Sequence, residues 1–450
     1  MQEGEGAMST PKEEPPPQVP ARDRQGGEIR ARWAWVEPEV WTERMLTALE
    51  TGVKGNRWFS LMDKVYRLET LATGWEQVRA NAGGSGVDGI TVERFAKDCP
   101  RGLLALNEQL RQGSYRPQPV KRCWIPKLGT SEKRPLGIPT VRDRIVQTAL
   151  RVVIEPIFEH QFAEHSYGFR PGRGCKDALR RVQHLLDEGS TWVVDADLKR
   201  YFDTIPHERL MAKVEERIAD GRVLGLIESY LKQGIMDGLT QHEAGEEGTP
   251  QGAVISPLLA NIYLDPLDHL MAREGYAMVR YADDFVILCR SREAAQAALG
   301  HVQAWVQDNG LTLHPEKTRI VDATQPGGFD FLGYHFERGY RWPRKKSLMK
   351  LKDSIRALTP RTSGHSLEVS ITRLNQTLRG WYGYFKHSHR TTFGPIDAYV
   401  RGRLRAILRR RHHRRGIAGG LDHQRWPNHY FIAFGLFSLV QADLATRRSP

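Results

Sequence analysis

Cysteine is scarce in this chain of 450 residues, which holds only four. They lie far apart, with no Cys-x-x-Cys pair and no Cys or His at the spacing of a zinc site, so neither a disulfide framework nor a zinc module is expected. Long apolar runs are missing too, and no stretch approaches the roughly 20 residues of a membrane span. The first 24 residues are rich in Glu and Pro and have no apolar core, unlike a secretory signal. The sequence predicts a cytoplasmic protein without membrane contact.

Acidic residues are rare in one block of the chain. Residues 341–418 hold 3 Asp and Glu against 20 Lys and Arg, a net charge of +17, while the whole chain carries +13 and the remainder therefore −4. A solvated helical face usually mixes charges of both signs. So unbalanced a block predicts a polyanionic partner that binds the C-terminal part of the chain.

Changes of composition divide the chain into four parts, because 450 residues exceed one ordinary core. Residues 1–30, rich in Pro and Glu, predict a disordered arm. Residues 31–342 alternate apolar segments with glycine-rich loops. Residues 343–418 show apolar positions at helical spacing, and residues 419–450 form a short aromatic segment that we expect to dock on those helices.

The order of elements between residues 192 and 321 limits the fold. Two strands flank Asp283 and Asp284, another strand ends near Asp197, and helices separate them in the order β-α-β-β-α-β. In this split βαβ arrangement the first strand lies beside the central hairpin. The sequence therefore predicts an α+β protein in which three carboxylates converge.

Three carboxylates without histidine or cysteine favour hard cations such as Mg²⁺. Two such ions can activate a hydroxyl and stabilise a leaving pyrophosphate. Taken alone, however, an Asp-Asp pair between strands is more often an ordinary solvated turn. The tetrapeptide from Tyr281 to Asp284 gains weight only from Asp197 and from the loops around it.

Two further loops carry positive charge. A predicted hairpin over residues 120–138 holds Lys127, Lys133 and Arg134, and it fits either a triphosphate-binding loop or an ordinary solvated hairpin. The loop 166–174 alternates glycines and aromatics with Arg170 and Arg173. Such a loop can follow a nucleic-acid backbone through its guanidinium groups.

Seven motifs in this order resemble those of a bacterial group II intron reverse transcriptase/maturase, over roughly residues 60–440. They are Gly86-Val87-Asp88-Gly89, Lys133 to Pro139, Ser166 to Gly174, Asp195 to Lys199 with Tyr201 to Asp203, Gly248 to Gly252, Tyr281 to Asp284, and Phe331 to Tyr334. An ordered series is far harder to obtain by chance than one tetrapeptide.

The resemblance implies a right-hand polymerase, with fingers and a split-βαβ palm within residues 31–342 and a helical thumb or maturase (X) domain over residues 343–418. It implies an RNA-directed DNA polymerase that uses two Mg²⁺ ions, with Mn²⁺ as a substitute, in the bacterial cytoplasm or at the nucleoid. The implied partners are group II intron RNA, an RNA template with a DNA primer, dNTPs and a DNA target. We expect no endonuclease domain in residues 419–450, which puts second-strand cleavage in doubt.

The resemblance also assigns roles to individual residues. The catalytic metal ligands are Asp197, Asp283 and Asp284. The nucleotide-binding residues are Lys127, Arg134, Phe202 as a steric gate against ribose, Gln251 and Lys317, although Lys133 could take either fingers role. The primer grip comprises Phe331, Leu332, Gly333 and Tyr334. The residues expected to bind RNA or template are Arg170, Arg173, Trp381, Tyr384, Lys386 and Arg390.

Two alternatives keep this fold. One is a splicing cofactor that binds RNA without polymerising, and the intact carboxylate triad argues against it because adjacent uncompensated carboxylates are costly. The other is a domesticated reverse transcriptase in defence or repair. The maturase-like basic block favours an intron partner over that reading.

Overall fold

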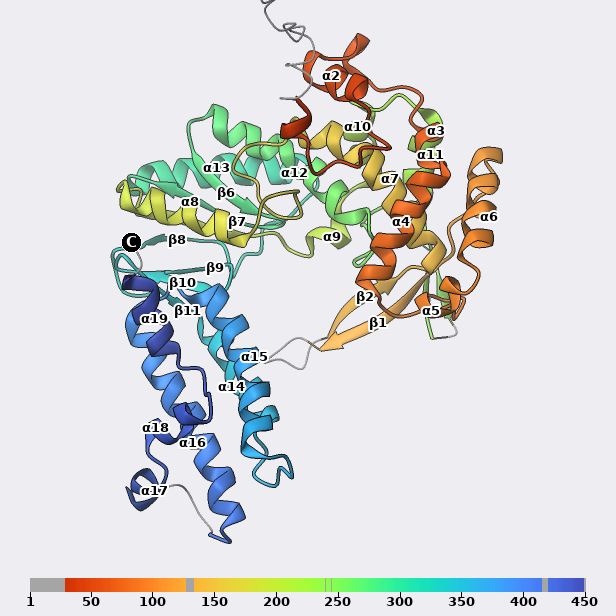
Figure 1. The fold of residues 1–450 in the computed structure, drawn as a ribbon. Helices are drawn as coiled ribbons and strands as arrows, with labels where there is room; N and C mark the ends of the chain where they lie inside the picture. The colour runs from red at the N-terminus through yellow and green to blue at the C-terminus, as the bar shows by residue number, and fades with distance from the viewer. Residues whose placement is uncertain (1–28, 127–132, 239, 244, 415–419, 449–450) are drawn as a thin grey trace, which may run out of the picture.

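The computed structural model describes residues 29–126, 133–238, 240–243, 245–414 and 420–448. A broad α/β body carries an elongated group of helices formed by the C-terminal part of the chain (Figure 1). Almost all of the predicted disordered arm, residues 1–30, lies outside the described residues. None of the described helices is long and apolar enough to cross a membrane.

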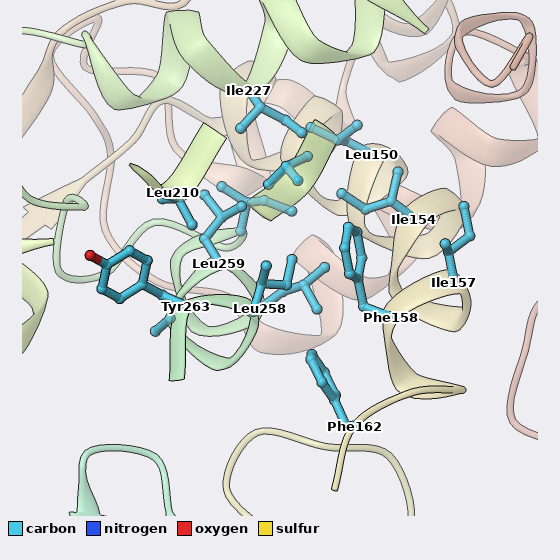
Figure 2. Close-up of a cluster of buried hydrophobic side chains, with 14 of the residues drawn as sticks. Leu150, Ile154, Ile157, Phe158, Phe162, Leu210, Ile227, Leu258, Leu259 and Tyr263 are labelled. Carbon is cyan, nitrogen blue, oxygen red and sulfur yellow. The ribbon is translucent and has the colours of Figure 1, made fainter. Parts of the chain in front are cut away.

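One long helix, α7, forms the centre of the body. Figure 2 shows its apolar side chains Leu150, Ile154 and Phe158 beside Leu258 and Leu259. Burying each such side chain contributes about 1.5–3 kcal/mol. The helices of this region are α2 (Glu43–Thr51), α3 (Met62–Val65), α4 (Leu68–Asn81), α5 (Val92–Ala96), α6 (Cys99–Gln112), α7 (Val141–Glu159), α10 (His207–Glu215) and α11 (Gly221–Leu231).

The predicted basic hairpin is present and belongs to a larger sheet than expected. Strands β1 (Val120–Pro126) and β2 (Lys133–Ile138) pair antiparallel, and β1 also pairs in parallel with β4 (Ile235–Asp237), which pairs with β5 (Thr240–His242). Strands of three residues give almost no alternation, so β4 and β5 had no sequence signal. The connecting loop with Lys127 lies outside the described residues.

The body also contains a second four-stranded sheet, in the order β6-β7-β3-β8. Helices α12 and α13 cover one face, and α8 covers the other (Figure 1). This confirms the predicted β-α-β-β-α-β order. The elements are α8 (Cys175–Asp187), β3 (Trp192–Asp197), α9 (Tyr201–Thr204), α12 (Ser256–Arg273), β6 (Ala277–Tyr281), β7 (Asp284–Cys289), α13 (Arg292–Asp308) and β8 (Arg319–Asp322).

A small aromatic sheet joins the body to the C-terminal helices. It has three strands, β9 (Phe329–Phe331), β10 (Tyr334–Glu337) and β11 (Tyr340–Pro343). Its buried side chains include Phe329 and Phe336, whose rings stack with centroids 5.0 Å apart.

The basic block is helical, as predicted. Trp426, Phe431 and Leu439 from the C-terminal segment are buried among the apolar residues of the preceding helices, so this segment docks as expected. Asp397 fixes the docking, because its carboxylate accepts hydrogen bonds from the Leu439 and Val440 amides at 3.0 and 3.2 Å. The helices are α14 (Lys345–Leu358), α15 (Leu367–Phe385), α16 (Phe393–Arg411), α17 (Gly420–Arg425), α18 (Asn428–Ala433) and α19 (Leu439–Arg448).

Candidate active site

The three predicted carboxylates gather at one end of the four-stranded sheet. Strands β6 and β7 are joined by a two-residue connection, Ala282 and Asp283, which we call the catalytic turn. Ala282 has φ 59°, an unusual value for a residue other than glycine. On the neighbouring strand Asp197 is the register partner of Asp284, so the two side chains lie on one face of the sheet.

Burial and the proximity of like charges raise the pKa values of two of these carboxylates. Burial, followed by the charges of Asp195, Asp283 and Asp197, raises the pKa of Asp284 to about 7. Burial and then the charge of Asp197 raise the pKa of Asp283. Positive charge at this end of the sheet does not offset the repulsion.

Asp195 is a fourth carboxylate, and the sequence did not predict it as a site residue. It lies two residues before Asp197, on the same face of β3. Its carboxylate accepts a hydrogen bond from Arg319 Nε at 3.2 Å, while Lys317 Nζ donates to Asp197 at 2.6 Å. Two cations from one segment therefore hold two carboxylates of β3.

The donor set suits a hard divalent cation in its chemistry, because it offers carboxylate oxygens and a repulsion that such a cation relieves. Within the described part of the chain, however, no three Asp, Glu, His or Cys side chains close around one point as a ready-made metal site. The charges of Asp195, Asp283 and Asp197 all act on Asp284, and Asp197 forms an ion pair with Lys317.

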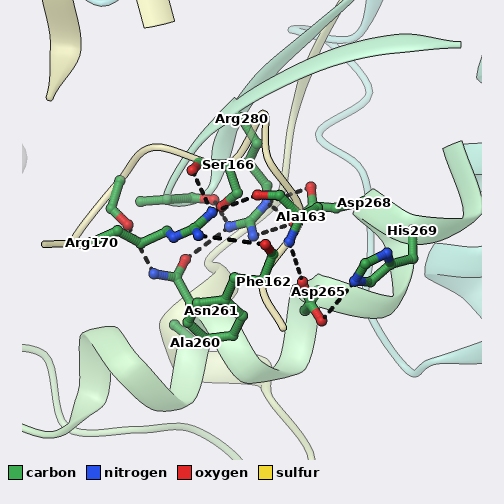
Figure 3. A network of polar contacts seen from close by, with 12 residues as sticks. Phe162, Ala163, Ser166, Arg170, Ala260, Asn261, Asp265, Asp268, His269 and Arg280 are labelled. Carbon is green, nitrogen blue, oxygen red and sulfur yellow. Dashed lines mark hydrogen bonds and ion pairs between the residues drawn. The ribbon is translucent and has the colours of Figure 1, made fainter. Parts of the chain in front are cut away.

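A buried polar network fixes the backbone of the catalytic turn (Figure 3). Arg280, whose side chain is fully buried, pairs with Asp268 through Nε at 2.8 and 2.9 Å. Its Nη1 donates to Asn261 and to the carbonyl oxygen of Ala282, both at 2.9 Å. The guanidinium thus ties helix α12 to the turn, a role that no sequence pattern revealed.

The loop 166–174 packs directly against the same turn. The Tyr167 amide donates to the Arg280 carbonyl oxygen at 2.8 Å. A Cβ on Gly168 would lie 2.2 Å from the amide nitrogen of Ala282, so only glycine fits. Asn261 donates to the Gly168 carbonyl oxygen at 2.8 Å.

The two arginines of this loop have different surroundings. The side chain of Arg170 is 2 % exposed, pairs with Glu159 at 2.8 Å and donates to the Ser166 carbonyl oxygen. Contrary to the prediction, it is a structural anchor and not a cation available to a template. Arg173 is half-buried, with its guanidinium 5.9 Å from the centroid of the Tyr167 ring.

Three of the predicted nucleotide-binding residues lie in different parts of the described structure, Phe202 on α9, Gln251 in the loop before α12 and Arg134 on β2. Phe202 is half-buried in α9, two residues after Arg200, which has φ 52°. Gln251 donates through Nε2 to Asp203 at 3.0 Å, and its carbonyl oxygen accepts from the Gly137 amide at 2.6 Å. Arg134 is exposed on β2, and its charge lowers the pKa of Asp283 against the larger effect of burial.

The predicted primer grip is a turn held by the C-terminal helices. Leu332 and Gly333 have φ 47° and 85° and connect β9 to β10, while Phe331 and Tyr334 are buried. Tyr384 donates to the Leu332 carbonyl oxygen at 2.6 Å, and Tyr334 donates to the Tyr384 carbonyl oxygen at 2.7 Å. Leu332 and Gly333 are half-exposed, so the turn itself is the accessible part of the motif.

The predicted RNA-binding residues around α15 divide into structural and exposed members. Trp381 stacks on Phe385 with ring centroids 4.7 Å apart, and Tyr384 is engaged at the Leu332–Gly333 turn. Lys386 is half-buried and Arg390 is exposed. The two cations are the members with charge at the surface.

Comparison with known proteins assigns both parts of the chain. Residues 125–336 match the family described as "Reverse transcriptase (RNA-dependent DNA polymerase)", and residues 348–426 match "Group II intron, maturase-specific domain". Protein YkfC of Escherichia coli K12 is 34% identical over 348 residues, which cover 68% of this chain and 86% of YkfC. The chain belongs to the group II intron reverse transcriptase/maturase family.

This reverse transcriptase/maturase also resembles longer intron-encoded proteins. The group II intron-encoded protein LtrA of Lactococcus lactis is 38% identical over 196 residues, 43% of this chain and 32% of LtrA. A 91 kDa protein in the cob intron of Schizosaccharomyces pombe is 40% identical over 296 residues, 53% of this chain and 35% of that protein. The chain thus spans about a third of these two relatives. Its reverse transcriptase domain implies dependence on a divalent metal and binding of an RNA template.

Proposed function

We propose that this reverse transcriptase/maturase synthesises DNA on an RNA template by nucleotidyl transfer at the catalytic turn, and binds group II intron RNA to assist its splicing and mobility. The observation that carries the proposal is that Asp197, Asp283 and Asp284 lie at one end of the sheet, beside a turn whose backbone is hydrogen-bonded to Arg280. These three carboxylates would hold two Mg²⁺ ions, or Mn²⁺. When bound, such ions would supply activation of the primer hydroxyl and charge stabilisation of the leaving pyrophosphate.

The chain's own residues supply binding and orientation. Arg134 and Lys127 would bind the triphosphate, and Phe202 would exclude a ribose 2′-hydroxyl. Asp203 orients the amide of Gln251, so that this side chain would meet the incoming nucleotide in a fixed position. Lys317 neutralises Asp197 before substrate binds and would then meet the departing phosphates.

Residues 31–342 would form the fingers and palm, and residues 343–418 the thumb and maturase domain. The turn at Leu332 and Gly333 would grip the primer through its backbone. The exposed cations of the basic block, including Arg390, would bind intron RNA and the template–primer. They would also bind a DNA target. These contacts are electrostatic, and their affinity should fall steeply with salt.

Primer extension on an RNA template with Mg²⁺ and dNTPs tests the proposal. The wild type should incorporate nucleotides, whereas Asp283→Ala should not, because one metal ligand is lost. Asp322→Ala, at the far end of β8, is the matched control and should retain activity. Equal, null incorporation by wild type and Asp283→Ala would instead favour a maturase that only binds RNA and assists splicing. A domesticated reverse transcriptase would polymerise but would not bind or splice a group II intron RNA.

A further inference from the structure

Phe169 is an exposed aromatic residue in a strained conformation beside the catalytic turn. Its φ is 58°, the residue is 50 % exposed, and its ring centroid lies 6.5 Å from that of Tyr281. A bulky residue in the left-handed region is a genuine outlier and costs about 1–3 kcal/mol. Half of the residue's surface stays exposed, so this ring is not a core side chain.

The chain on either side of Phe169 is held firmly. Gly168 lies against the amide of Ala282 and its carbonyl oxygen accepts a bond from Asn261 at 2.8 Å. Arg170 is fixed by Glu159 and by the carbonyl oxygens of Ser166, at 2.7 Å, and Ala163. Two buried anchors therefore force the residue between them to present its side chain outward.

The ring of Phe169 lies beside the catalytic turn, where the substrate would be bound. Tyr281, which it faces, directly precedes the catalytic turn and is the register partner of Asp284. An exposed aromatic ring on a fixed backbone, beside the ring of Tyr281, offers a stacking surface to a base or a sugar.

We propose that Phe169 is a primer–template binding residue, whose ring stacks on a nucleotide of the duplex next to the catalytic turn. The inference rests on the proposed polymerase function and adds to it a contact made by an uncharged side chain. This contact depends little on salt, unlike those of the basic block, because it releases no counterion.

The test separates binding from folding, because one substitution should weaken primer–template binding without lowering the stability of the fold. In Phe169→Gly the ring is lost but the strain is relieved, since glycine adopts positive φ freely. We expect the melting temperature to stay equal or rise, and the Kd for an RNA–DNA primer–template in elevated salt to rise about 10-fold, within the range for one aromatic–base stack. The kcat at saturating primer–template should change less than about 2-fold.

Three controls accompany this variant. Phe169→Tyr keeps the ring and should keep wild-type Kd. Ala82→Gly relieves strain at another residue with positive φ, 52°, and Phe59→Ala removes another exposed ring, 62 % exposed, from the N-terminal segment. Neither should weaken primer–template binding.

An unchanged Kd in Phe169→Gly overturns the proposal, as does a rise in Kd that comes with a lower melting temperature and is shared by Phe169→Tyr. Loss of all incorporation by the wild type would instead refute the polymerase function. The Kd measurement does not depend on that activity, so the two failures are distinguishable.

Discussion

The pair of Arg280 and Asp268 allows stability and activity to be separated. The side chains are 0 and 5 % exposed, so Asp268→Asn leaves a guanidinium buried without its counter-charge. Removing one partner of a buried ion pair costs about 3–5 kcal/mol. We expect Asp268→Asn to lower the free energy of unfolding by this amount, which is measured as a lower denaturant midpoint, and to abolish primer extension.

The double variant Asp268→Leu, Arg280→Met carries the decisive comparison. Apolar residues of similar volume often restore the stability of a buried pair, so its midpoint should return close to that of the wild type. Primer extension should remain lost, because the bonds from Arg280 to Asn261 and to the Ala282 carbonyl oxygen are gone. A double variant as unstable as Asp268→Asn would refute the argument on stability. A stable and active one would refute the role of Arg280 in fixing the catalytic turn.

Two other substitutions test the surroundings of the site. Burial, and the charge of Glu159, raise the pKa of Glu155 to about 7 from an ordinary 4.5, so this group lowers stability as pH rises between these values. Glu155→Gln should match the wild type near pH 4 and exceed its unfolding free energy by up to about 3 kcal/mol at pH 8; a constant difference across this range contradicts the assignment. Tyr384→Phe removes the bond to the Leu332 carbonyl oxygen, worth about 1 kcal/mol. It should shorten cDNA products made in the presence of a trap while leaving single-nucleotide incorporation unchanged, and equal product lengths would exclude a role in the grip.

Long elements with clear periodicity were predictable from the sequence. Helices α12 and α13 and the strands between them follow an order that only a few sheet topologies accommodate, so the approach of Asp197 to Asp283 and Asp284 followed from connectivity alone. The basic character of the C-terminal helices was equally direct, because charge counts do not depend on the fold.

Contacts between isolated residues were not predictable. Arg280 pairs with Asp268 and Asn261, 12 and 19 positions earlier in the chain, and such spacing carries no pattern. Arg170 shows the reverse error. The sequence predicted an exposed arginine, because the residue lies in a glycine-rich loop. Its proximity to Glu159 on α7, which appears only in the folded structure, makes it a buried anchor.

Backbone strain connects these observations. Nine residues other than glycine have positive φ in the described part of the chain, and four of them border the site: Phe169, Arg200, Ala282 and Leu332. Each costs free energy that glycine or asparagine would avoid, so the fold must supply it elsewhere. The buried guanidiniums of Arg170 and Arg280, and the hydrogen bond from Tyr384 to Leu332, lie beside three of the four and hold their backbone in place. Loops whose conformation is set by rigid helices can therefore present carboxylates and an aromatic ring in fixed positions before any substrate binds, which is the condition for efficient positioning of a primer end.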